Sequence, residues 1–394
     1  MKDIIIFGGI DWDGGRKLPI HHVAARLARN NRVFYVDNFG AVRDFWISDI
    51  PRALKKTKNI FGKKRKHSME NDVVVWKQMV VPVPRLPSLI GRLNVFLLRK
   101  GMERLVRTYR IKDPVIWTRV PTDLVWRSLE KISRRMLVYQ AVDKFPFSPK
   151  ISVSLRPRLI ESEKMFCRSA DIVFASARGL YDEKKRENPN TYFFPNGVDA
   201  DIFLKDYSPD PRGDIKRPVI GFAGALGTWV DYRLLMGAAR LRPEYSFVLL
   251  GPRAPESDLC GLDRMPNVYL PGVIKYEGLP AWFRKFDVGL IPYRVTDFTN
   301  YTFPSKMAEY LTVGLPVIST PLPEVLPYSK VVYIVKDPEE MVLSIDRALQ
   351  EKDRETRYAE RMAVAATLSW DRIVTEMERL IDECLGAEEN KDDT

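Results

Sequence analysis

Residues 4–36 read IIIFGGIDWDGGRKLPIHHVAARLARNNRVFYV, and this stretch decides the fold class. Residues 4–7 form a short apolar run that is typical of a buried parallel strand, and two glycines end it. Helical spacing follows over residues 21–29, and residues 33–36 are a second apolar run. A strand, a helix and a strand at this spacing make a βαβ unit, which predicts a parallel sheet.

The same alternation continues along the chain and restarts once. In the first half, further apolar runs lie at 73–76, 115–117, 137–139 and 172–175. Residues 205–218 are rich in Pro, Asp and Lys and have no periodicity, which predicts a linker. New runs follow at 219–223, 247–250, 267–270, 288–291 and 317–319. We therefore expect two doubly wound α/β domains, 1–204 and 219–368, then a helix near 370–385 and a disordered tail at 387–394.

Composition and charge limit the class of protein. The 394 residues include 63 Lys+Arg and 51 Asp+Glu, a net charge of +12, and residues 1–200 alone hold 39 basic and 20 acidic side chains. A chain that is 45% hydrophobic and 29% charged is neither disordered nor fibrous. Three widely spaced cysteines favour a reducing compartment over a disulfide scaffold or a structural zinc site. Without a signal-peptide pattern or an apolar run of about 18 residues, we expect a cytoplasmic protein.

The densest candidate cluster is at 300–324, which reads NYTFPSKMAEYLTVGLPVISTPLPE. Pro304 suits a helix start and Gly314 a helix end, so the spacing predicts a helix over 305–313. The first-turn amides of a helix can bind a phosphate, and a cation at Lys306 needs an anion such as a diphosphate nearby. Glu309 lies on the same face and could accept hydrogen bonds from ribose hydroxyls. An ordinary surface Lys–Glu pair explains the same spacing equally well.

This cluster resembles a known family. Residues 304–320 resemble the donor-binding segment of GT-B glycosyltransferases of the group 1 (family 4) type. Further resemblance lies in FPNGVD at 194–199, IGFAG at 220–224, FVLLG at 247–251, NVYLPG at 267–272 and SW at 369–370. WVD at 229–231, PLPEV at 321–325 and the opening at 21–37 are most similar to the teichuronic-acid glycosyltransferase subgroup. The resemblance spans nearly the whole chain, and is strong in 190–325 and weak in 40–115.

The resemblance implies a fold and a reaction. It implies two Rossmann-like domains that face each other across a cleft, with the acceptor bound by 1–204 and the nucleotide sugar by 219–368. Residues 369–386 would cross back to the first domain. The reaction implied is hexosyl transfer with retention from a nucleotide-diphosphate sugar, a UDP-sugar before a GDP-sugar, with no cofactor and no essential metal.

Site residues carry over position by position. Glu309 matches the ribose-binding Glu, Lys306 a phosphate-binding lysine, and Asp143 falls where many members have a His-Asp pair near the reacting sugar. These three residues are the catalytic candidates. The other donor-binding candidates are Gly8, Gly9, Gly224, Val273, Ile274, Arg294, Tyr301, Thr302, Phe303 and Ser305.

Three departures from the family pattern leave alternatives open. Tyr301 stands where the motif has its first Glu, Val142 stands where many members have His, and no basic residue follows Gly224 before Arg233. The missing His is tolerable because the leaving diphosphate can itself take the acceptor proton while the protein stabilises it. The first and third departures favour an alternative, a non-catalytic GT-B subunit that binds sugar nucleotide or glycan for a polysaccharide assembly complex. A nucleotide-sugar epimerase is a further alternative.

Histidines offer no metal site. His21 and His22 are adjacent, and His67 is the only other histidine in the sequence. A metal site needs ligands that converge, so we expect the adjacent pair to be histidines of a helix start and the core.

A basic stretch indicates the partner of the first half. Residues 52–66 hold eight Lys/Arg and no acid, and the helical stretch 89–110 mixes leucines with arginines. Such a surface would gain about 1 kcal/mol per basic residue near anionic lipid, and no nucleic-acid module accompanies it. A solvated loop beside a packed helix is the alternative. The sequence therefore predicts a peripheral enzyme of the inner membrane face that acts on a glycan or glycolipid of the cell envelope. The candidate membrane or acceptor surface is Lys55, Lys56, Lys58, Lys63, Lys64, Arg65, Lys66, Arg99 and Lys100.

Overall fold

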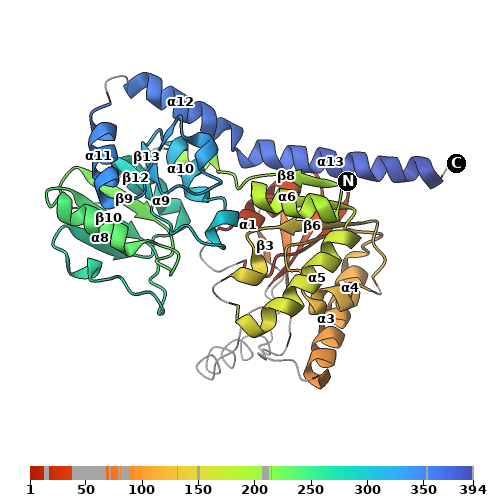
Figure 1. Ribbon diagram of the computed structural model, residues 1–394. Helices are drawn as coiled ribbons and strands as arrows, with labels where there is room; N and C mark the ends of the chain where they lie inside the picture. Colours follow the sequence, from red (N-terminus) through yellow and green to blue (C-terminus); the bar gives the residue numbers. More distant parts are fainter. Residues whose placement is uncertain are drawn as a thin grey trace. The chain divides into compact units, whose positions relative to one another are not determined.

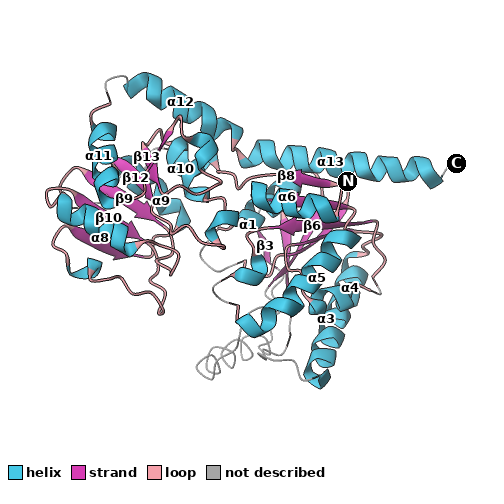
Figure 2. Cartoon of the chain, in the orientation of Figure 1, coloured by secondary structure: helices cyan, strands magenta, loops and turns pink. Residues whose placement is uncertain are grey.

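The protein folds into two α/β units. The computed structural model describes residues 1–12, 17–37, 68–70, 72–78, 80, 88–130, 132–148, 151–205, 213, 215–351 and 354–392. One unit comprises Met1–Phe194 with Val374–Thr394, and the other comprises Pro195–Ile373 (Figure 1). In each unit a sheet of mainly parallel strands is flanked by helices (Figure 2). This confirms the predicted fold class.

The described residues of the first unit form an eight-stranded sheet in the order β3-β4-β2-β1-β5-β6-β7-β8. All neighbouring strands are parallel except β3, which is antiparallel to β4. The strands are β1 (Asp3–Phe7), β2 (Arg32–Asp37), β3 (Ser68–Glu70), β4 (Val73–Lys77), β5 (Val115–Thr118), β6 (Met136–Ala141), β7 (Ile172–Ala175) and β8 (Thr191–Phe193). The helices are α1 (Pro19–Leu27), α3 (Ser88–Tyr109), α4 (Asp123–Leu129), α5 (Arg156–Ser169), α6 (Arg178–Glu187) and most of α13 (Trp370–Asp392).

The second unit has a six-stranded, all-parallel sheet in the order β11-β10-β9-β12-β13-β14. The strands are β9 (Val219–Ala223), β10 (Ser246–Leu250), β11 (Val268–Gly272), β12 (Val288–Ile291), β13 (Val317–Ser319) and β14 (Val332–Ile334). The helices are α7 (Ala200–Leu204), α8 (Tyr232–Leu241), α9 (Leu279–Lys285), α10 (Ser305–Thr312), α11 (Pro338–Leu349) and α12 (Arg354–Thr367).

Strand order reverses once in each sheet. In the first unit β2 and β5 flank β1, and in the second unit β10 and β12 flank β9. Open α/β sheets bind ligands beyond the carboxyl ends of the strands at such a reversal. In this chain Gly8 directly follows β1 and Gly224 directly follows β9. Both glycine turns that the sequence singled out therefore lie at a reversal of strand order.

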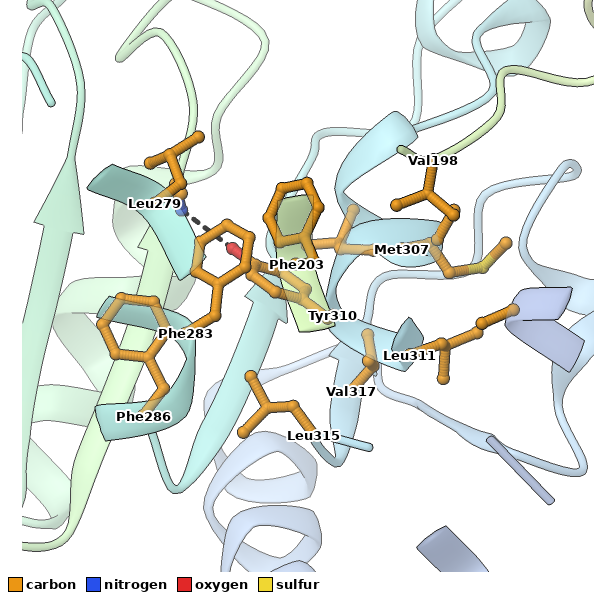
Figure 3. Close-up of a cluster of buried hydrophobic side chains, with 14 of the residues drawn as sticks. Val198, Phe203, Leu279, Phe283, Phe286, Met307, Tyr310, Leu311, Leu315 and Val317 are labelled. Atoms are coloured by element: carbon orange, nitrogen blue, oxygen red, sulfur yellow. Dashed lines mark hydrogen bonds between the residues drawn. The ribbon is translucent and has the colours of Figure 1, made fainter. Parts of the chain in front are cut away.

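A buried core fixes helix α10 on the second sheet (Figure 3). Tyr310 is fully buried, and its hydroxyl accepts a 2.8 Å hydrogen bond from the backbone N–H of Ala223 at the end of β9. The Phe283 ring from α9 packs edge-on against the Tyr310 ring, with centroids 4.8 Å apart. Such aromatic pairs prefer this geometry, and it adds to the stabilisation that burial provides.

The chain enters the second unit earlier than the predicted boundary at 204/205. Val198 and Phe203 are buried in the same core as Tyr310, which places the division at Phe194/Pro195. The backbone of Val198 also pairs with the returning chain, accepting from Trp370 N–H at 3.0 Å and donating to Leu368 O at 2.8 Å. Most of the predicted linker 205–218 lies outside the described residues.

Helix α13 returns to the first unit and is longer than predicted. Its Asp382 accepts a 2.5 Å hydrogen bond from the Lys2 ammonium, and Glu378 accepts one of 2.5 Å from the Asn31 side-chain amide. The helix continues to Asp392, through part of the segment 387–394 that we expected to be a disordered tail. Alanine, glutamate and lysine in that segment are good helix formers, and no proline interrupts them. None of the described helices is long and apolar enough to span a membrane.

We predict that Gly251→Ala destabilises the second unit far more than Gly261→Ala. Both glycines have a left-handed φ, +137° and +83°, so both substitutions strain the backbone by about 1–3 kcal/mol. A Cβ at 251 would also lie 1.9 Å from the carbonyl oxygen of Gly224, whereas a Cβ at 261 would meet no atom within 4 Å. Urea denaturation should show at least twice the loss for Gly251→Ala. Equal losses would mean that the close approach of the two turns is unimportant.

Candidate functional site

Three glycine turns lie side by side at the carboxyl ends of β9, β10 and β11 in the second sheet. The Gly224 N–H donates to Leu250 O at 2.9 Å, and the Gly251 N–H donates to Gly272 O at 2.7 Å. The turns after β9, β10 and β11 are thus held against one another by backbone hydrogen bonds. Because Gly224, Gly251 and Gly272 have no side chains, a ligand can approach the backbone closely at these positions.

Val273 and Ile274, the predicted base-binding pair, point to different surroundings. Val273 is 63% exposed, whereas Ile274 packs on the buried core of the second unit. Val273 is therefore the member of the pair with free surface for a ligand.

Two loops at this edge are paired with each other. The Asp231 N–H donates to Pro292 O at 2.8 Å, and the Arg294 N–H donates to Trp229 O at 2.8 Å. The Asp231 carboxylate also accepts from Leu234 N–H at 3.0 Å, which caps helix α8. The WVD pattern at 229–231 therefore braces the turn after β9 against the turn after β12. It leaves the Arg294 side chain exposed.

The loop before α10 is held from several directions. Residues Thr299–Tyr301 form a 3₁₀ turn, and Thr302 Oγ1 donates to Phe298 O at 3.2 Å. The side-chain amide of Asn196 donates to Phe303 O at 3.0 Å, and both residues are buried. Asn196 was not among the predicted site residues, although it lies in the FPNGVD segment. It fixes the predicted diphosphate loop from within the second unit.

Lys306 and Glu309 meet as the spacing predicts, but not on an open surface. Lys306 Nζ lies 2.5 Å from Glu309 Oε2, and their side chains are 17% and 6% exposed. The ammonium also lies 5.9 Å from the centroid of the Phe283 ring. An ordinary surface pair of the same spacing, Lys100–Glu103, is 57% and 38% exposed. The structure therefore disfavours the surface-pair interpretation of residues 306 and 309.

The glycine loop of the first unit packs around a buried tyrosine. The Tyr35 hydroxyl donates to Ile10 O at 2.9 Å, and a Cβ on Gly8 would lie 2.0 Å from that hydroxyl. Gly9 has a φ of +68°, which favours glycine. His21 is buried, and its Nδ1 accepts from Leu18 N–H at 3.1 Å, as expected of a core histidine at a helix start. Within the described ranges no cluster of His, Cys, Asp and Glu could hold a metal ion.

Asp143 follows β6 in a strained conformation. Its φ is +58°, a left-handed value that few residues other than glycine adopt, and Phe145 N–H donates to its carbonyl at 2.9 Å. Such strain is most often retained at functional positions.

Arg119, which the sequence reasoning missed, directly follows β5. Burial lowers the pKa of its guanidinium, and the Asp143 carboxylate partly offsets this by raising that pKa. The two charged groups therefore interact electrostatically. A charged residue placed two positions after the apolar run at 115–117 was the signal that could have revealed it.

The predicted membrane surface divides into two parts. Lys55, Lys56, Lys58, Lys63, Lys64, Arg65 and Lys66 lie outside the described residues. Arg99 donates from its guanidinium to Arg127 O at 2.8 Å, so it faces α4 rather than solvent. Lys100 is exposed on the outer face of α3. On the same helix Leu89, Leu93 and Phe96 are 75%, 44% and 55% exposed, at a spacing that aligns them along one face.

Most of the second unit matches a known family in sequence. Residues 217–351 match the family described as Glycosyl transferases group 1. A Bacillus subtilis (strain 168) protein, named as the teichuronic acid biosynthesis glycosyltransferase TuaH, is 26% identical over 230 residues. The match covers 55% of this chain and 58% of that protein, so the chain spans little more than half the length of this relative.

Solved structures share the fold over nearly the whole chain. Sucrose-phosphate synthase from Thermosynechococcus elongatus has a TM-score of 0.73 at 15% identity, covering 98% of this chain and 100% of its own. Anabaena HepE, solved with UDP-glucose, has a TM-score of 0.65 at 16% identity and covers 97% and 100%. WaaG, a glycosyltransferase involved in lipopolysaccharide biosynthesis, has a TM-score of 0.60 at 11% identity and covers 96% and 98%. These neighbours confirm the GT-B fold.

We predict an asymmetric double-mutant cycle for the buried pair. Lys306→Met leaves the nearly buried Glu309 without its cation, and breaking a buried pair in this way costs about 3–5 kcal/mol. Glu309→Gln leaves a lysine that reaches solvent and should cost less, and the double variant should recover part of the first loss. Urea denaturation measures all three variants.

The matched control for this cycle is the exposed pair Lys100–Glu103, which has the same spacing and residue order. Its cycle should give a coupling of about 0–0.5 kcal/mol, as for exposed helix pairs. A coupling at 306 and 309 no larger than this would show that burial does not strengthen the pair.

Proposed function

We propose that this protein is a retaining glycosyltransferase of the hexosyltransferase type that takes its sugar from a nucleotide-diphosphate sugar. One observation carries the proposal: the segment that matches the group 1 family contains a nearly buried Glu309, with Lys306 beside it in the first turn of α10. We favour a UDP-sugar as donor, because Anabaena HepE with the same fold binds UDP-glucose. The proposed acceptor is a lipid-linked or cell-envelope polysaccharide, and the name of the Bacillus relative, which refers to teichuronic acid biosynthesis, supports this choice.

The donor would lie at the carboxyl edge of the second sheet. In this proposal the Glu309 carboxylate accepts hydrogen bonds from the two ribose hydroxyls, and Lys306 turns to the diphosphate. The backbone of the Gly224 turn and of the loop at 302–305 would lie along the diphosphate and sugar, with Val273 beside the base. Exposed Arg294 offers a second cation at the same edge.

The chemical step needs no protein nucleophile. The bond between the anomeric carbon and the diphosphate oxygen breaks, and the acceptor hydroxyl oxygen bonds to that carbon on the same face. The hydroxyl proton passes to the leaving diphosphate. The protein's part is to stabilise charge on that group with fixed dipoles and cations. We assign Asp143 to the acceptor side, where its charge would orient hydroxyl groups.

Glu309→Ala should reduce donor use at least tenfold. Losing hydrogen bonds to a carboxylate costs about 1.5–3 kcal/mol, which is about 10–100-fold in kcat/KM. The assay follows UDP release from a panel of UDP-sugars, with and without added glycan. Glu339→Ala, an exposed carboxylate on α11, is the matched control and should release UDP like the parent protein.

Asp143→Asn complements this test. Asparagine tolerates the left-handed φ at 143, so the variant removes charge without added backbone strain. We expect slower UDP release at an unchanged melting temperature. Binding of UDP-sugars without any release by the parent protein would favour the non-catalytic subunit, which Tyr301 in place of a motif Glu motivates. Interconversion of the free UDP-sugar would favour an epimerase.

We also propose that the outer face of α3 contacts an anionic membrane. Three exposed apolar residues, Leu89, Leu93 and Phe96, lie along this face, and exposed Lys100, Arg104 and Arg107 follow them on the same helix. Apolar side chains that enter the headgroup region together with basic residues are typical of interfacial helices. This arrangement gives an apolar contact that a solvated loop beside a packed helix would lack.

Changing Leu89, Leu93 and Phe96 together to Ser should abolish most binding to liposomes that contain anionic lipid. The measurement is cosedimentation with vesicles of phosphatidylglycerol and phosphatidylcholine at two salt concentrations. Leu343→Ser, an exposed leucine of the second unit, is the control and should bind like the parent protein. Unchanged binding by the triple variant would exclude α3 as the contact.

A further inference from the structure

Arg119 occupies the reversal of strand order in the first unit. It is the first residue after β5, and β5 lies between β1 and β6 in the sheet. Its N–H donates to Phe7 O at 3.4 Å, which sets its backbone beside the glycine turn that follows β1. Asp143 follows the end of β6 on the other side. The carboxyl ends of three adjacent strands thus bring Gly8, Arg119 and Asp143 to one edge.

Within the part of the chain that the structure describes, no contacting counter-ion neutralises the guanidinium of Arg119. Its surroundings are largely desolvated, which by itself disfavours a cation. Among the described residues, none forms an ion pair or a side-chain hydrogen bond with it, and the Asp143 carboxylate acts on it through its charge. Arg119 is nevertheless partly exposed at this edge, so a ligand can reach it from solvent. A partner from outside the chain would supply the missing anion.

We propose that Arg119 binds an oxyanion of a sugar substrate, a phosphate or a carboxylate, at the reversal of strand order in the first unit. The planar guanidinium matches the two oxygens of either group. The Asp143 carboxylate beside it accepts hydrogen bonds from hydroxyls and repels a second anion. Together the two side chains fit a ligand with an acidic group next to hydroxyl groups, such as a sugar phosphate or a uronic acid. This inference rests on the proposed function, because it names the substrate class of the acceptor side.

The test measures binding rather than turnover. Calorimetry with glucose 1-phosphate, glucuronate and neutral glucose compares the parent protein with Arg119→Gln and Arg119→Lys. We expect Arg119→Gln to weaken binding of one of the two anions at least tenfold and Arg119→Lys to weaken it less. Glucose should bind equally to all three proteins. The anion whose binding is weakened by Arg119→Gln identifies the acidic group that Arg119 recognises. UDP is a fourth probe, and weaker binding of UDP would show that Arg119 binds the diphosphate of the donor instead.

Two control variants show whether a loss of anion binding is specific to Arg119. Arg110→Gln removes an exposed arginine that precedes β5 at its amino end, and should bind the anions like the parent protein. Glu339→Gln removes an exposed carboxylate of the second unit and should likewise leave binding of the two sugar anions unchanged. Sugar transfer is tested separately by UDP release from Glu309→Ala, so failed sugar transfer and failed anion binding remain distinguishable. If Arg119→Gln does not fold, the double variant Arg119→Gln/Asp143→Asn removes both charges and takes its place. Equal binding of anions by the parent protein and Arg119→Gln, or no preference for either anion over glucose, would overturn the proposal.

Discussion

One hydrogen bond holds the candidate donor site in register with the sheet beneath it. The N–H of Ala223, the last residue of β9, donates to the buried hydroxyl of Tyr310. Desolvation raises the pKa of Tyr310 well above its usual value, so the hydroxyl stays neutral at physiological pH. Tyr310 directly follows Glu309 on α10. The bond therefore sets the distance between the glycine turn after β9 and the helix face that carries the charged pair.

The two units share a topological feature but place different charged groups beside it. Each places a glycine turn after its first strand at a reversal of strand order. The second unit adds a nearly buried ion pair on a helix, and the first adds Arg119 and Asp143 at neighbouring strand ends. The charged side chains that contribute to the net charge of +12 therefore lie in different surroundings in the two units. Within the described residues, no contacting counter-ion neutralises Arg119 in the first unit, whereas Glu309 neutralises Lys306 in the second.

Most strands and the charged pair Lys306–Glu309 could be predicted from the sequence, because buried parallel strands are apolar runs and helix spacing is periodic. The short strand β8 and the polar helix α6 could not, since three residues show no periodicity and α6 buries only Leu180 and Lys184. The burial of Glu309 could not be predicted either, because residue spacing shows which face of a helix a side chain lies on but not which residues cover that face. Arg119 was missed because its importance comes from the order of strands in space, and a single sequence does not reveal that order.

The path of the chain through the first unit has a consequence for its synthesis. Lys2, which precedes β1, and Asn31, which follows α1, contact α13, so residues made before the second unit contact residues made after it. The second unit lies wholly between them in the chain and holds all the residues of its own sheet. On a ribosome, the second unit can complete its core while the first still lacks a helix. The first unit becomes complete only after α13 has been made, so the unit that begins before the other is finished after it.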